Sequence, residues 1–307
     1  MKRLALLLMP LALALGQTPT LRVDVQLSQI VVTVTDAQGR HITNLKAGDF
    51  ALELDGEPQP IAHFSQDSEA PVALGLVMDM SGSMRASLGA ARKAGATFIR
   101  GLGPRDEFLL AAFSDSFKVW QPLTRDKEKL IREFESVHPM AMGGTDLLNS
   151  VIKAEQLLLK SSNKKRALVL ITDGLESKCS LSSEAFAAKL VRAGVVVYGI
   201  RMPLNVMGVT TLSPLILNSS RACLKAPSTM AFFNILETAT GSRTFELKPE
   251  ARSLDADLEA IFSQISVELR AQYTLGFYPV TKRESAIRVR TTHPEYQVRT
   301  QQKAVPK

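Results

Sequence analysis

Residues 72–84 read VALGLVMDMSGSM, an unbroken apolar run that ends in an aspartate followed by two serines. Such a run without polar residues is typical of a strand that is covered on both faces, as in a parallel sheet. Residues 84–102 then repeat apolar positions at helical spacing, and strand-like and helix-like segments alternate up to residue 270. Alternating buried strands and amphipathic helices predict a doubly wound, mostly parallel α/β sheet.

The predicted strands of this sheet span residues 72–78, 108–114, 117–123, 167–172, 195–200 and 243–247. The predicted helices span residues 84–102, 126–137, 146–160, 182–193, 231–240 and 253–269. Residues 201–230 form a connection much longer than the usual median of about 4–6 residues. The sequence does not distinguish between a partner-binding insert and a cover for the sheet edge.

Both flanks of the α/β segment alternate with a period of two. The alternating apolar positions include Phe50, Leu52 and Leu54 before it and Tyr273, Leu275 and Phe277 after it. This pattern predicts antiparallel strands with one wetted face. Because each flank is too short to build a good core alone, we expect them to pair in one small, β-sandwich-like antiparallel domain. The expected boundaries are 17–69 and 271–307 for the β segments and 70–270 for the inserted α/β domain.

Residues 1–16 have the pattern of a secretory signal peptide. Lys2 and Arg3 precede the apolar run from Leu4 to Leu15, which a small residue, Gly16, follows. The run is too short to span a bilayer, which needs about 20 residues. We therefore expect a secreted or periplasmic protein with no transmembrane segment in the mature chain.

The composition is that of a globular protein, with 45% hydrophobic and 22% charged residues. The formal net charge is +7, and without Lys2 and Arg3 the chain keeps 35 basic and 30 acidic residues. Aromatic residues make up only 6% of the chain, with a single Trp, which leaves few platforms for base stacking. The composition therefore argues against a nucleic-acid partner.

Oxygen-bearing side chains follow two predicted strands and precede one predicted helix. Asp79, Ser81 and Ser83 follow the first strand, Thr145 lies before helix 146–160, and Asp173 follows strand 167–172. In open α/β sheets, ligands bind at the carboxyl ends of the strands. Two carboxylates and three hydroxyls are hard ligands that suit Mg²⁺, Mn²⁺ or Ca²⁺ better than zinc or copper. A cation held by only two charged groups can accept a carboxylate from another molecule.

The pattern Asp79-x-Ser81-x-Ser83, followed by Thr145 and Asp173, resembles the metal-ion-dependent adhesion site (MIDAS) of von Willebrand factor type A (VWA) domains. The resemblance covers residues 70–270, and the β flanks resemble the bacterial secreted VWFA-related proteins. It implies that Ser81 and Ser83 bind the cation directly. It implies that Thr145, Asp79 and Asp173 do so directly or through water. It also implies a non-enzymatic protein for cation-dependent protein–protein interaction or adhesion, whose partner offers an acidic residue.

Other chemistries fit the residues less well. A haloacid-dehalogenase-like phosphotransferase needs an aspartate at position 81, and a nucleophile elbow needs glycines two residues before and after Ser81. No Gly-x-Gly-x-x-Gly follows the first strand. The sequence thus predicts a binding protein rather than an enzyme. Two alternatives stay open: a structural envelope component in which the metal only stabilises the fold, and a metal-dependent hydrolase.

Two further pairs of residues flank the predicted metal edge. Cys179 follows the Asp173 turn and Cys223 lies in the long connection, so in an oxidising compartment they could form a disulfide or remain free thiols. Met140 and Met142 precede Thr145. Because methionine adapts to varied surfaces, these two fit a partner-contacting rim as well as they fit packing.

Overall fold

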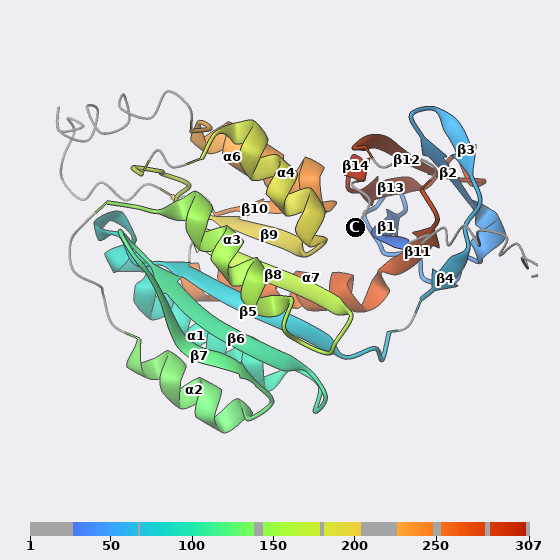
Figure 1. The fold of residues 1–307 in the computed structure, drawn as a ribbon. Helices are drawn as coiled ribbons and strands as arrows, with labels where there is room; N and C mark the ends of the chain where they lie inside the picture. Colours follow the sequence, from blue (N-terminus) through green and yellow to red (C-terminus); the bar gives the residue numbers. More distant parts are fainter. Residues whose placement is uncertain are drawn as a thin grey trace, which may run out of the picture.

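The computed structural model describes residues 27–66, 68–137, 144–178, 181–203, 226–247, 253–279 and 283–304. The predicted signal peptide, Cys179, Cys223, Met140, Met142 and most of the 201–230 connection lie outside these residues. The described chain forms an α/β part and a β part, which lie side by side (Figure 1).

A six-stranded sheet in the order β10-β9-β8-β5-β6-β7 forms the centre of the α/β part. Its strands are β5 (Val72–Asp79), β6 (Glu107–Phe113), β7 (Phe117–Thr124), β8 (Lys165–Thr172), β9 (Val196–Arg201) and β10 (Thr244–Glu246). Every pair is parallel except β6 with β7. That pair is antiparallel because the link of residues 114–116 is too short for a crossover. The predicted mostly parallel sheet is confirmed.

Helices cover both faces of this sheet. One face carries α1 (Leu88–Arg100), α2 (Lys127–Ser136) and α7 (Leu254–Ala271), and the other carries α3 (Leu147–Leu158), α4 (Ser183–Ala193) and α6 (Thr229–Thr240). The first helix begins later than its periodicity predicts, because residues 82–87 form a 3₁₀ turn, η2 (Gly82–Ser87). The expected starts of α2, α4 and α7 carry the N-caps Asp126, Ser182 and Ser253. Asp126, for example, accepts a hydrogen bond from the Lys129 amide at 2.9 Å.

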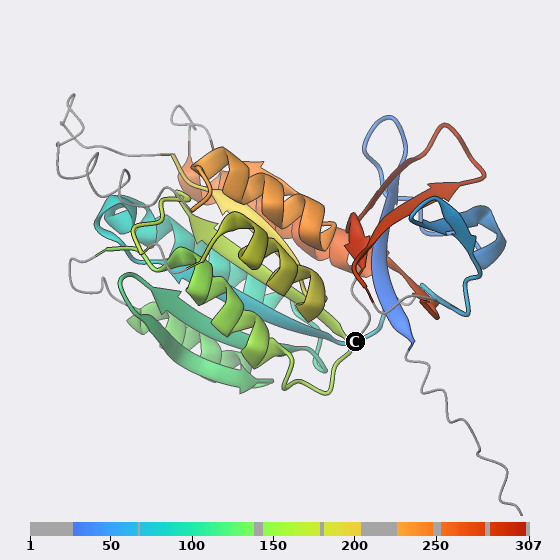
Figure 2. The same cartoon turned by 45° about the horizontal axis from the view of Figure 1, so that its top comes forward.

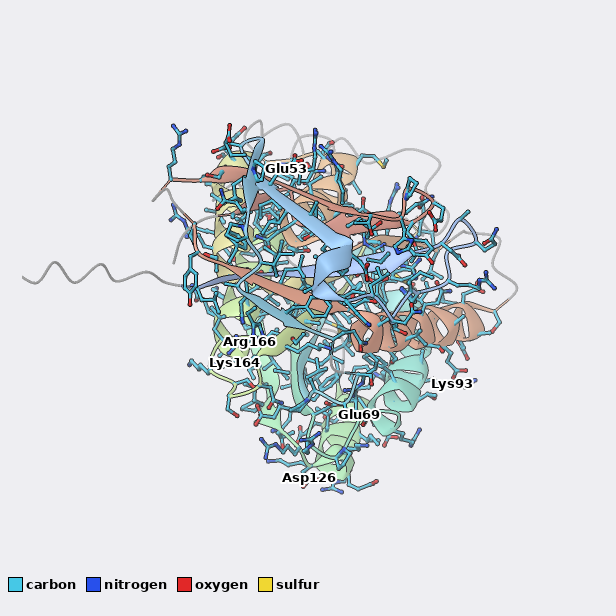
Figure 3. All side chains as sticks on the ribbon, turned by 90° about the vertical axis from the view of Figure 1, so that its right-hand side faces the viewer. Glu53, Glu69, Lys93, Asp126, Lys164 and Arg166 are labelled. Carbon is cyan, nitrogen blue, oxygen red and sulfur yellow. The ribbon has the colours of Figure 1, made fainter. Side chains whose placement is uncertain are left out.

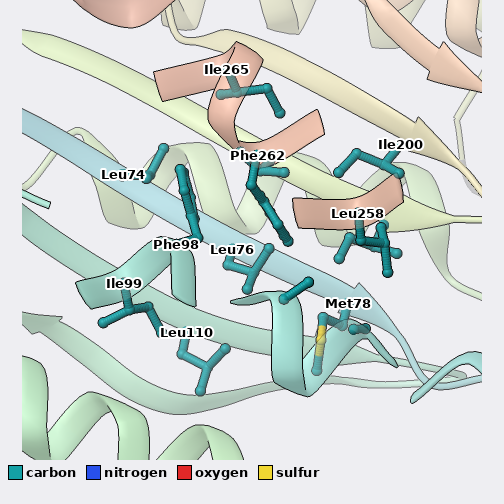
Figure 4. Close-up of a cluster of buried hydrophobic side chains, with 14 of the residues drawn as sticks. Leu74, Leu76, Met78, Phe98, Ile99, Leu110, Ile200, Leu258, Phe262 and Ile265 are labelled. Carbon is teal, nitrogen blue, oxygen red and sulfur yellow. The ribbon is translucent and has the colours of Figure 1, made fainter. Parts of the chain in front are cut away.

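Strand β5 is buried at every position, as its unbroken apolar sequence predicts. Leu74, Leu76 and Met78 face α1 and α7, where the rings of Phe98 and Phe262 stack with centroids 4.6 Å apart (Figure 4). The alternate residues of β5 belong to the core on the opposite face of the sheet. Packing on both faces fixes where β5 ends, and therefore where the side chains that follow it lie.

The β part consists of two four-stranded sheets, ordered β13-β1-β11-β4 and β14-β12-β2-β3. The strands before the insertion are β1 (Ser28–Thr35), β2 (Phe50–Leu54), β3 (Glu57–Gln59) and β4 (His63–Ser65). Those after it are β11 (Tyr273–Phe277), β12 (Ser285–Thr291), β13 (Gln297–Thr300) and β14 (Lys303–Ala304). Strand β1 pairs antiparallel with β11 and β13, and β2 pairs with β12 (Figure 2). This pairing confirms that the two flanks form one antiparallel unit around the inserted α/β part. The boundaries at residues 69, 70, 270 and 271 stay a prediction.

An aromatic cluster forms the centre of the β part. The ring of Tyr273 lies 5.1 Å from that of Phe50 and 5.8 Å from that of Phe64. Its hydroxyl donates to the carbonyl of Ile42 at 2.9 Å and accepts from the Leu45 amide at 3.1 Å.

Seen from the side of the β part, Glu53 of β2 lies far from Asp126 at the start of α2 (Figure 3).

A buried ion network joins the two parts. Glu268 of α7 is only 1% exposed and forms ion pairs with Arg299 of β13 and with Arg243, the latter at 3.3 Å. The hydroxyl of Tyr198 on β9 donates to Glu268 at 3.0 Å. Because breaking a buried ion pair leaves an uncompensated charge, this network resists separation of α7 from β13.

Helix α3 carries a buried carboxyl outside any such network. Glu155 is 1% exposed, and within the described residues neither of its carboxyl oxygens has a hydrogen-bond partner. Burial raises the pKa of the Glu155 carboxyl well above its ordinary value of 4.5. The folded chain therefore keeps a proton on Glu155 that the unfolded chain releases, and stability is lost as the pH rises above about 4.5.

We predict that Glu155→Gln flattens this pH dependence. At pH 8 the variant should exceed the original chain in free energy of unfolding by about 1–3 kcal/mol, and near pH 4 the two should be equal. Urea unfolding at both pH values measures the difference, with the exposed Glu135→Gln of α2 as control. A Glu155→Gln profile parallel to that of the original chain would contradict the assignment.

Candidate metal centre

The candidate metal centre lies where β5 and β8 end, at the edge of the sheet that points away from the β part (Figure 1). The two strands are parallel neighbours, with Met78 paired to Ile171. Asp79 therefore ends β5 level with Thr172, and Asp173 follows one residue beyond. The register of two buried strands thus places both carboxylates at one point.

Hydrogen bonds link four of the five predicted site residues directly. The Ser83 hydroxyl donates to Asp173 Oδ2 at 2.5 Å, and the hydroxyl oxygens of Ser81 and Ser83 lie 3.2 Å apart. The backbone amide of Ser81 donates to Asp79 Oδ1 at 2.8 Å, which bends the chain back over the strand end. The structure therefore brings together Asp79, Ser81, Ser83 and Asp173.

Thr145, the fifth predicted residue, is tied to the same edge through its backbone. Its carbonyl accepts from the Ser177 amide at 3.0 Å, and its amide donates to the Ser177 hydroxyl at 2.5 Å. Ser177 belongs to the loop that begins at Asp173. The next residue, Asp146, donates its amide to the carbonyl of Ser114 after β6 at 2.7 Å. These bonds hold the Thr145 loop beside the Asp173 loop.

Gly174 shapes the turn after Asp173. Its φ of +79° lies in the left-handed region, which residues other than glycine rarely adopt. A Cβ there would also lie 2.7 Å from Thr229 and 2.8 Å from Phe233, both on α6. The turn lets the Leu175 amide donate to Asp173 Oδ1 at 3.1 Å, so the carboxylate is fixed by its own loop.

The two carboxylates are each only 2% exposed. Burial, together with the neighbouring charge of Asp173, raises the pKa of Asp79 from 3.8 to about 6, although hydrogen bonds from Ser81 and Thr172 oppose this shift. No Lys or Arg among the described residues forms an ion pair with either carboxylate. A divalent cation would supply the missing positive charge, so the donor set fits one.

The donor set also limits the kind of cation. In the part of the chain that the structure describes, no three His, Cys, Asp or Glu side chains are grouped as metal ligands. The set of carboxylate and hydroxyl oxygens is the kind that hard cations prefer.

Two residues that support the site escaped the sequence prediction. Thr172 donates its hydroxyl to Asp79 Oδ2 at 2.7 Å, and Ser177 anchors Thr145. Thr172 ends a strand beside Asp173, and that position is a usable signal. Ser177 carries no such signal, because only the folded loops bring it to Thr145.

The comparisons with known proteins agree with this fold. Residues 74–176 match the family model of the von Willebrand factor type A domain. No curated protein sequence matches the chain.

Solved structures of similar fold include a von Willebrand factor type A protein from Catenulispora acidiphila. It is 12% identical, with a TM-score of 0.50, over 86% of this chain and 75% of that one. BatB from Bacteroides thetaiotaomicron is 18% identical over 64% of this chain and 97% of its own, with a TM-score of 0.46.

Proximal thread matrix protein 1 from the mussel byssus, described with a zinc-occupied MIDAS motif, is 17% identical, with a TM-score of 0.45. The match covers 69% of this chain and about half, 48%, of that one. Identities this low show the fold alone. Residues 74–176, which lie within the α/β part, are therefore similar to a von Willebrand factor type A domain.

We predict that Asp79→Asn stabilises the cation-free protein and removes its response to cations. Without a cation, replacing one of two buried, adjacent carboxylates should raise the free energy of unfolding by about 1–2 kcal/mol at pH 7. With Mg²⁺, only the original chain should gain in melting temperature. Thermal melts with Mg²⁺ or EDTA measure both effects, and the exposed Glu246→Gln of β10 is the control. A variant that keeps the Mg²⁺ response would refute the role of Asp79.

Proposed function

We propose that this chain is an exported, non-enzymatic protein that binds a divalent cation, Mg²⁺ first, through Asp79, Ser81, Ser83, Thr145 and Asp173. The cation would then bind an acidic side chain of a partner protein, as in adhesion or another cation-dependent protein–protein interaction. The observation that carries the proposal is the hydrogen-bonded set of two buried carboxylates and two hydroxyls at the ends of β5 and β8.

The count of ligands supports an open coordination position. Mg²⁺ takes six oxygen ligands in octahedral geometry, and Ca²⁺ takes six to eight. Five side chains that each offer one oxygen leave at least one position for water or for a ligand from outside. The two carboxylates neutralise the charge of a divalent cation without exceeding it. A third carboxylate from a partner therefore meets no net negative charge at the site.

Export is supported by the sequence of residues 1–16, with its basic start and short apolar run. Among the described helices, none has the length and apolar character needed to cross a membrane.

A purely structural cation is the second candidate function. The burial of Asp79 and Asp173 favours it, because neutralising two buried charges stabilises the fold whether or not a partner binds. The two functions differ in whether the bound ion accepts an outside carboxylate.

We predict that acetate enters the coordination shell of Mn²⁺ bound to this protein. Paramagnetic relaxation of the acetate methyl protons should be enhanced in the presence of the Mn²⁺-loaded chain, because the methyl group then comes close to the ion. The same titration with Asp173→Asn should show only the enhancement of free Mn²⁺, and Glu246→Gln should behave like the original chain.

Tight Mn²⁺ binding without enhanced acetate relaxation would favour the structural function instead. Turnover of a simple phosphate ester that Asp173→Asn abolishes would instead favour a metal-dependent hydrolase.

A further inference from the structure

Helix α3, which begins directly after the Thr145 loop, is capped by a side chain from another loop. The first amides of a helix have no partner within the helix. Asp146, at the N-cap position of α3, makes no capping hydrogen bond with its side chain, because its Oδ1 atom accepts from the Asn149 side chain at 2.8 Å. The carboxylate of Glu176 accepts from the Leu148 amide at 2.9 Å instead.

Glu176 belongs to the loop that begins at Asp173, one of the candidate metal ligands. Its Oε1 atom accepts from the Lys178 amide of the same loop at 2.5 Å, and its Oε2 atom is the one that binds the Leu148 amide. Because the two oxygens bind amides of two different segments, this single carboxylate ties the Asp173 loop to the start of α3.

The negative charge of Glu176 suits this position. The start of a helix carries the positive end of the helix dipole, which a carboxylate stabilises. Burial raises the pKa of the Glu176 carboxyl to about 7, although the hydrogen bonds from the Leu148 and Lys178 amides oppose this shift. Above that pH the side chain is a carboxylate, and its bonds to both amides are charge-assisted.

The Thr145 loop and the Asp173 loop also touch directly. A Cβ on Gly144 would lie 2.4 Å from the Ser177 Oγ atom, so the close approach needs a glycine. The Thr145 carbonyl accepts from the Lys178 amide at 3.3 Å as well as from that of Ser177. These bonds use the backbone of Thr145 and do not need its hydroxyl. Thr145 thus lies between the Ser177 contact and the start of α3, which Glu176 fixes.

We propose that Glu176 is a positioning residue of the candidate metal centre, which holds the Thr145 hydroxyl within reach of the cation. This inference rests on the proposed function, because it takes Thr145 as one of the ligands. Without the Glu176 carboxylate, the start of α3 loses its bond to the Asp173 loop, and the Thr145 hydroxyl is the ligand that moves. The ligands that follow β5 are held by bonds that do not involve Glu176.

A double-mutant cycle tests the proposal. Calorimetric titration with Mg²⁺ at pH 8, above the pKa of Glu176, measures the affinity of the full chain. Glu176→Ala should weaken it by about tenfold, the low end for residues that orient metal ligands. Thr145→Val keeps the shape of the side chain and the backbone bonds but lacks the hydroxyl, and it should weaken Mg²⁺ at least as much. Because Glu176 acts through Thr145, the double variant should lie within about twofold of Thr145→Val alone.

Asp126→Ala is the matched control, because Asp126 also caps a helix, with its carboxylate 2.9 Å from the Lys129 amide of α2. It should leave the Mg²⁺ affinity unchanged, and circular dichroism checks that each variant folds. Glu176→Gln loses the charge and one acceptor oxygen but keeps the size of the side chain. It should weaken Mg²⁺ by about threefold, since one of two hydrogen bonds remains. It replaces Glu176→Ala in the cycle if that variant does not fold.

Three results would overturn the inference while Mg²⁺ still binds the original chain. They are an unchanged affinity in the Glu176 variants, a loss that persists in full when Thr145→Val is present, and an equal loss from Asp126→Ala. An Mg²⁺ affinity that Thr145→Val leaves unchanged would overturn the role of Thr145 and this inference together. No binding of Mg²⁺, Mn²⁺ or Ca²⁺ by the original chain would overturn the proposed function itself.

Discussion

The structure depends on one alignment, that of β5 with β8 in the centre of the parallel sheet. Both strands are buried on both faces by two separate cores, so neither can slip without exposing apolar side chains. The register Met78 to Ile171 then brings Asp79 and Asp173 to the same edge. Two like charges in so little water are unfavourable by themselves. A divalent cation bound between the two carboxylates would offset this repulsion.

The β part is built from segments on both sides of the α/β part in the sequence. Strand β1 lies between β11 and β13, and β2 pairs with β12. The β part can therefore form only after the whole α/β part has been synthesised. The buried network of Glu268, Arg299, Arg243 and Tyr198 then connects the two parts at the end far from the metal edge.

Much of this could be predicted from the sequence because the signals are local. An unbroken apolar run gave β5, and period-two alternation around Phe50 and Tyr273 gave the β flanks, since burial on one face or two leaves a direct trace in the residues. Asp79, Ser81 and Ser83 stand within five residues of each other, so their proximity was visible. The 3₁₀ turn over residues 82–87 could not be predicted, because the spacing of apolar residues does not distinguish it from the α-helix that follows.

What the sequence could not reveal depends on contacts between distant segments. Ser177 anchors Thr145, and Thr172 donates to Asp79, only after the loops have met. Glu155 lies on the helix face that also carries Val151 and Leu158, but a charged side chain gives no sign that it is buried there. Arg40 and Leu269, which are far apart in the chain, line one cavity where the α/β part meets the β part.

The central claim is that a divalent cation lies between Ser81, Ser83, Thr145 and the two aspartates. Crystals grown with Mn²⁺ test it most directly, because the anomalous signal of the ion gives its position independently of any interpretation. The account predicts one strong peak within about 2.5 Å of the Ser81 and Ser83 hydroxyl oxygens, with a coordination position left to water or to an outside ligand. The absence of a peak there at saturating Mn²⁺, or a peak bound by other residues alone, would contradict it.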